Sequence, residues 1–260
     1  MKTSSRSNRI IPDRPMGKPK LLFVGEGPAD VGRPEFPGGA LAGFLTAVLA
    51  APGPAAKGAD LPFVISSVKR WTTDAPLLPR SSGKPTSFRK LLSGYEPDTR
   101  RAHAFLLLAK QLDMDGVVII RDCERRGNVQ LGSILRAAGA LFDERKAPTE
   151  IRPGFVVAAP SRAHEKWLLA DREAVRSVLD SEALFSFSGD PEERPSAETL
   201  KVHLSKHCQR LHQNESDCRR ELAFRARPDE LSRRCPQCYP DFVKDVETEL
   251  GEEKTVDDDK

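Results

Sequence analysis

The sequence predicts an α/β protein: a mostly parallel β-sheet flanked by helices, with a C-terminal helical extension. Three observations predict this class. Short apolar segments alternate with segments of helical length, which is the pattern of right-handed βαβ crossovers. Val117–Ile120 consists entirely of β-branched apolar residues, as expected for a strand buried on both faces of a sheet. After residue 171 the sequence contains only helix-like and irregular segments.

The individual elements follow from their own residues. The strands are predicted where short apolar runs occur, over 20–27, 61–68, 117–120 and 155–160. The helices are predicted from apolar spacing and from capping residues, over 39–49, 98–112, 128–142 and 163–171. Residues 72–98 contain four Pro and two Gly, so we expect mainly loop there, with a short helix over 87–92.

Four segments are expected along the chain. They are a basic leader over 1–17, an α/β domain over 18–175, a helical extension over 176–250 packed at one edge of that domain, and an acidic tail over 251–260. The first 20 residues carry six Lys/Arg and one acid, whereas the last 20 carry nine acids and three Lys. Ends of this composition are more often solvated than binding arms.

Composition limits the class of protein and its compartment. The formal net charge of +3 is nearly neutral, so global charge does not indicate a nucleic-acid-binding protein. The longest apolar run, Ala40–Ala51, is too short to span a bilayer, and the basic start lacks the apolar segment of a secretory signal. Five cysteines fit a reducing compartment better than a disulfide framework. We therefore expect a cytoplasmic protein without a membrane span.

Acidic residues follow three of the predicted strands. Glu26 ends the first strand, Asp122 and Glu124 follow the strand over 117–120, and Glu165 begins a helix after the strand over 155–160. Sites in parallel sheets form beyond the carboxyl ends of the strands, so these four acids are expected at one sheet edge. Clustered carboxylates repel unless a cation joins them, and Mg²⁺ or Mn²⁺ prefers carboxylate oxygen. The alternative is that the acids lie in loops as surface ion-pair partners or helix-capping residues.

These residues carry a resemblance. A strand ending in Glu with nearby Gly, followed later by a strand ending in Asp-x-acid, resembles the Toprim domains of topoisomerases, primases, small ribonucleases and overcoming-lysogenization-defect nucleases. The segments FVGEGPAD, VVIIRDCE and AAPSRAHEKWLLAD look like the compact bacterial Toprim-like family DUF4276, over roughly residues 18–175. The resemblance implies a Toprim-like fold and a divalent-metal-dependent nuclease.

The resemblance also implies roles for individual residues. Glu26 takes the general acid/base or metal-ligand position, Asp122 and Glu124 the metal-binding pair, and Glu165 the additional acid. Two positions depart from the family pattern: Glu124 replaces the usual Asp, and Ala29 stands where a small hydroxyl residue is usual. The genetic setting implied is bacterial defence or mobile-element biology, with an SMC-like, ABC-type ATPase as a partner.

Two further groups are candidate sites. A phosphate-binding rim for DNA or RNA is predicted from the basic residues beside the acids, with solvated charge as the alternative: Arg121, Arg125, Arg126 and Lys166. A structural Zn²⁺ is a less favoured reading of the C-x₂-C spacing in the C-terminal segment, with buried or free thiols as the default: Cys208, Cys218, Cys235 and Cys238.

Three functions remain open from the sequence. The leading hypothesis is hydrolysis of DNA or RNA phosphodiesters with Mg²⁺ or Mn²⁺. The first alternative is a non-catalytic Toprim-like binding or regulatory subunit, and the second is a small-molecule phosphohydrolase. The chain has no G-x₄-G-K-[ST] motif, so it is not itself expected to be the ATPase.

Overall fold

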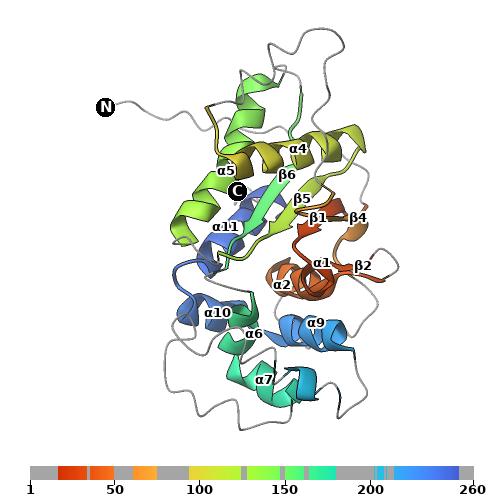
Figure 1. Ribbon diagram of the computed structural model, residues 1–260, viewed down its shortest axis with the longest axis vertical. Helices are drawn as coiled ribbons and strands as arrows, with labels where there is room; N and C mark the ends of the chain where they lie inside the picture. The colour runs from red at the N-terminus through yellow and green to blue at the C-terminus, as the bar shows by residue number, and fades with distance from the viewer. Residues whose placement is uncertain are drawn as a thin grey trace, which may run out of the picture.

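The computed structural model describes residues 17–33, 36–49, 61–74, 94–123, 128–146, 150–160, 164–179, 202, 204–207, 209 and 214–251. Its centre is a four-stranded parallel sheet of β1 (Lys20–Gly25), β4 (Val64–Arg70), β5 (Gly116–Ile120) and β6 (Gly154–Ala158). The strand order is β4-β1-β5-β6. The predicted α/β class with a parallel sheet and flanking helices is therefore confirmed (Figure 1). The short helix predicted over 87–92 lies outside the described residues.

Residues of alternate strand positions face opposite sides of the sheet, and each side has its own apolar core. On one side, α4 (Pro97–Gln111) and α5 (Asn128–Arg145) cover the first set of strand residues. That set is Leu22, Val24, Val117, Ile119, Phe155 and Val157. On the other side, α2 (Gly39–Leu49), α6 (Glu165–Ala170) and the C-terminal helices cover the second set. That set is Leu21, Phe23, Val118, Ile120, Val156 and Ala158.

The C-terminal extension consists of α9 (Glu215–Arg225), α10 (Pro228–Arg234) and α11 (Tyr239–Glu249), which follow α7 (Arg172–Leu179). Its apolar side chains belong to the same core as the sheet. The sequence predicted packing at one edge of the domain; the structure places α9 against α2 and α11 along the edge strand β6 (Figure 1). The extension is therefore part of the folded core, because its buried residues complete one side of the sheet.

Helix α11 covers the outer edge of the sheet with carboxylates. Asp245 accepts the backbone N–H of Val157 at 3.3 Å, and Glu249 accepts that of Phe155 at 3.2 Å. Unpaired N–H groups of an edge strand otherwise invite pairing with another chain. Arg152 and Arg136 hold the two carboxylates in place, at 2.8 Å in each case.

Candidate metal centre

The site lies where the direction of the sheet connections reverses. Strand β1 pairs with β4 on one side and with β5 on the other, so the strands that follow β1 in the chain lie on both of its sides. Ligands of open α/β sheets bind beyond the carboxyl ends of the strands at such a point. Glu26 directly follows β1, and Arg121 and Asp122 directly follow β5. The structure therefore brings the ends of the first and third predicted strands together at neighbouring positions.

Three residues form a group able to hold a metal ion. Ligand atoms of Asp122, His164 and Glu165 all lie within 4.8 Å of one another. His164 Nδ1 lies 3.4 Å from Asp122 Oδ1 and 3.6 Å from Glu165 Oε2. Asp122 Oδ1 also accepts the backbone N–H of His164 at 2.9 Å, which fixes the start of α6 beside the end of β5.

A fourth acid comes from α1 (Pro28–Val31), the short helix after β1. Asp30 Oδ2 accepts the Gly27 N–H at 2.8 Å, and its Oδ1 lies 3.2 Å from His164 Nδ1. The turn needs glycine at position 25, because a Cβ there would lie 2.8 Å from Val31 and 2.9 Å from Asp30. Asp30 is not among the four acids predicted for the site; in the structure it caps the turn and also faces the metal-capable group.

The charges of this cluster shift the protonation of its members. Burial opposes a charge on His164, but the negative charges of Asp30, Asp122 and Glu165 outweigh burial and raise the pKa of His164 to about 9. Burial raises the pKa of Asp30, partly offset by His164. Burial also acts to raise the pKa of Glu165, but His164 and Arg219 outweigh it and lower that pKa.

Arg219 of α9 closes the cluster on its inner side. Its Nη1 donates to Glu165 Oε1 at 2.7 Å and lies 3.2 Å from His164 Nε2. Its Nε and Nη2 donate to Glu215 at 3.1 Å and 2.6 Å. The sequence analysis missed Arg219, because no local motif connects it with Glu165.

The donor set fits a divalent cation. Two carboxylates and one imidazole offer oxygen and nitrogen ligands from the end of β5 and the start of α6, and all three side chains are at most 16% exposed. Oxygen donors suit Mg²⁺ and Mn²⁺ alike, whereas an imidazole ligand favours a transition metal over Mg²⁺. The buried group of Asp122, His164 and Glu165 is thus a possible metal site, and the structure does not define the metal.

The remaining predicted residues fall into different places. The Glu26 side chain is 41% exposed and lies 3.6 Å from Arg121, outside the group of three. Glu124, Arg125 and Arg126 lie outside the described residues. Lys166, predicted for the phosphate rim, is only 2% exposed, because its position in the first turn of α6 places it in the interior.

Asp171, Trp167 and the C-terminal cysteines have structural contacts. Asp171 pairs with Arg227 at the start of α10, at 2.8 Å, and Trp167 is fully buried in the core. Cys218, Cys235 and Cys238 are buried, and the Trp167 indole N–H donates to the Cys238 sulfur at 3.1 Å. Within the described part of the chain these cysteines form no metal-ligating group, so the structure gives no support to a zinc site there; Cys208 lies outside that part.

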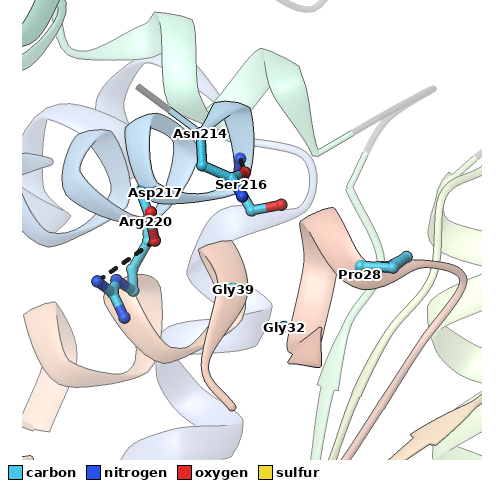
Figure 2. A pocket seen from close by; sticks show the side chains of 7 residues that line it. All are labelled: Pro28, Gly32, Gly39, Asn214, Ser216, Asp217 and Arg220. Carbon is cyan, nitrogen blue, oxygen red and sulfur yellow. Dashed lines mark hydrogen bonds and ion pairs between the residues drawn. The ribbon is translucent and has the colours of Figure 1, made fainter. Parts of the chain in front are cut away.

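A cavity of about 400 Å³ lies between α1, the start of α2 and the start of α9 (Figure 2). Its wall includes the backbone at Gly32 and Gly39 and the side chains of Ser216 and Arg220. Figure 2 shows Arg220 turned toward Asp217, with which it pairs at 3.5 Å. The cavity adjoins α1, the helix that carries Asp30, but contains none of the three metal-capable side chains.

No protein-family model, curated protein or solved structure matches the chain. Among the described helices, none combines the length and apolar character needed to cross a bilayer.

Proposed function

We propose that the chain is a divalent-metal-dependent phosphodiesterase that hydrolyses DNA or RNA. The observation that carries the proposal is the meeting of Asp122, His164 and Glu165 at the end of β5, next to Glu26 and Arg121. Sites for phosphoryl chemistry need carboxylates for a cation and a positive side chain for the phosphate at one place. The donor set supports Mn²⁺ over Mg²⁺.

Each residue has a role in this proposal. Asp122, His164 and Glu165 hold the cation, which when bound supplies Lewis-acid activation of the phosphate and of water. Glu26 is exposed enough to accept the proton of the attacking water, whose oxygen forms the new bond to phosphorus as the bond to the leaving oxygen breaks. Arg121 neutralises the phosphate, and Asp30 orients the His164 ring from the side opposite Arg219.

The Toprim-like relationship and the ATPase partner belong to the same proposal. The Toprim-like relationship is supported by the parallel sheet with an acid after β1 and an acid after β5, the order in which the resembling segments occur in the sequence. The ATPase partner is implied by the resemblance alone. A cytoplasmic location and a role in bacterial defence remain predictions from the sequence.

One observation favours a non-catalytic alternative. Arg219 already pairs with Glu165, and His164 already lies among three carboxylates, so part of the negative charge is balanced without a metal ion. A binding or regulatory subunit would keep this network for stability alone. Such a protein would bind Mn²⁺ weakly and would cut no phosphodiester.

Cleavage assays distinguish these functions. Plasmid, single-stranded DNA and RNA are incubated with Mn²⁺, Mg²⁺ or EDTA, using wild type, Asp122→Asn and the control Asp241→Asn, whose side chain is 60% exposed on α11. We expect metal-dependent cutting by wild type and the control, and a loss of more than about 100-fold in Asp122→Asn. Full activity in Asp122→Asn contradicts the assignment. Hydrolysis of a model phosphodiester without cutting of any polynucleotide supports the small-molecule phosphohydrolase instead.

A further inference from the structure

A tryptophan lies beside the end of β1, next to the proposed site. Trp71 directly follows β4, and its backbone N–H donates to the Gly25 carbonyl at 2.7 Å. The indole is 1% exposed and packs against Phe105, at 5.8 Å between ring centroids. Among the described residues its Nε1 has no hydrogen-bond acceptor. Trp71 is therefore a fixed, buried ring beside the end of β1, and it cannot itself stack a base.

Two arginines lie against this one indole. The guanidinium carbon of Arg121 is 4.9 Å from the ring centroid, and that of Arg101, in the first turns of α4, is 5.5 Å away. A cation over an aromatic ring is attracted to the ring face, so the indole restricts the positions of both guanidinium groups. The two positive charges are thus held near one another instead of being dispersed in solvent.

The two arginines differ in their acidic partners. Arg121 donates to Asp98 at 2.9 Å and lies 3.6 Å from Glu26. Arg101 has no ion pair with any residue that the structure describes, and its side chain is only partly buried. Among the described residues no carboxylate pairs with Arg101 beside Arg121, and a guanidinium in that situation suits a phosphate oxygen.

We infer that Arg101 and Arg121, held by Trp71, form a second phosphate subsite for a polynucleotide strand. The inference rests on the proposed function and deepens it. Arg121 adjoins Asp122 in the chain and takes the phosphate at the metal-capable group, and Arg101 takes a neighbouring phosphate of the same strand. A mononucleotide or small phosphate ester engages only one of the two positions, so the subsite selects polynucleotides.

Binding without cleavage tests the inference. Fluorescence anisotropy of a labelled single-stranded oligonucleotide is measured in EDTA at several salt concentrations, for wild type, Arg101→Ala and Arg233→Ala. Arg233 is 67% exposed on α10 and pairs with Glu230, so its variant removes the same charge away from the sheet. We expect Arg101→Ala to weaken binding about 3- to 10-fold and to reduce the salt dependence by about one phosphate contact, with no change in Arg233→Ala.

The role of Trp71 is tested by the same assay. Trp71→Phe keeps an aromatic face and should bind nearly as wild type, whereas Trp71→Leu should weaken binding like Arg101→Ala. Thermal unfolding of each variant identifies any that is not folded, and the Phe variant keeps the test valid if the Leu variant fails to fold.

The outcomes separate the two proposals. Equal binding by Arg101→Ala and Arg233→Ala overturns the subsite and leaves the metal-dependent phosphodiesterase standing. A wild type that binds Mn²⁺ but no oligonucleotide also overturns the subsite, and then the substrate is a small ester. A wild type that binds neither Mn²⁺ nor oligonucleotide overturns both.

Discussion

The imidazole of His164 and the carboxylate of Asp30 meet at 3.2 Å, although one residue begins α6 and the other lies in the helix after β1. Asp30 is 6% exposed and His164 is 4% exposed. Two buried groups at this distance depend on each other, because Asp30 contributes negative charge that favours a charged His164, and His164 in turn offsets the burial of the Asp30 carboxylate. The pair therefore ties the start of α6 to the turn after β1.

Stability of the metal-free protein should depend on the charge of His164. The folded pKa of about 9 lies above the ordinary 6.5, so the charged ring stabilises the fold fully below pH 6.5. That contribution, on the order of 3 kcal/mol, is lost as pH rises through about 9. Denaturant unfolding in EDTA should give wild type a higher free energy of unfolding than His164→Gln at pH 6. At pH 10 this difference should be lost. A difference in the free energy of unfolding between wild type and His164→Gln that is the same at pH 6 and pH 10 contradicts this account.

The Asp171–Arg227 pair should matter more than the ion pairs around it. Asp171 is fully buried and accepts the backbone N–H of Glu173 as well as the Arg227 guanidinium. Asp171→Asn should cost about 2–3 kcal/mol, because the Glu173 N–H and the Arg227 guanidinium lose a charged, buried acceptor. Glu173 pairs with the same Arg227 at 2.9 Å but is 73% exposed, so Glu173→Gln should cost less than about 0.5 kcal/mol. If urea unfolding shows that Asp171→Asn and Glu173→Gln lower the free energy of unfolding equally, the burial of Asp171 does not strengthen its pairing.

The contact between α2 and α9 should be sensitive to one methyl group. A Cβ at Gly43 would lie 2.5 Å from the Cβ of Ala223, whereas a Cβ at Gly27 would meet nothing within 4 Å. Gly43→Ala should therefore destabilise the fold by about 1–3 kcal/mol, despite the better helix propensity of alanine. Gly27→Ala is the control and should change stability little. If Gly43→Ala is as stable as wild type in thermal unfolding, α9 does not pack on α2 this closely.

The fold was predictable where local pattern and burial agree. Val117–Ile120 reads as a strand buried on both faces, and all four residues are at most 1% exposed in β5. The pattern failed at the end of β4, predicted over 61–68 and observed over Val64–Arg70. Lys69 and Arg70 are polar, but their backbone pairs with β1 as far as Gly25, and pairing with a neighbour is not encoded in hydropathy.

The site was predictable only in part. Asp122 and Glu165 stand at strand and helix ends, where sheet topology places functional groups. His164 is not among the residues predicted for the site, because a single His carries no pattern of its own. Arg219 is far from the other members in sequence, and only the packing of α9 brings it to Glu165. Long-range pairs of this kind depend on the tertiary fold, so the residues alone do not reveal them.

Mn²⁺ binding by the purified protein tests the central claim most directly. Isothermal titration would compare wild type, Asp122→Asn and the exposed control Asp241→Asn, all after treatment with EDTA. We predict that wild type and the control bind Mn²⁺ at one site, and that Asp122→Asn weakens this binding at least about 10-fold, because it removes a carboxylate ligand. Equal binding by all three proteins, or no binding by wild type, would contradict a metal centre formed by Asp122, His164 and Glu165.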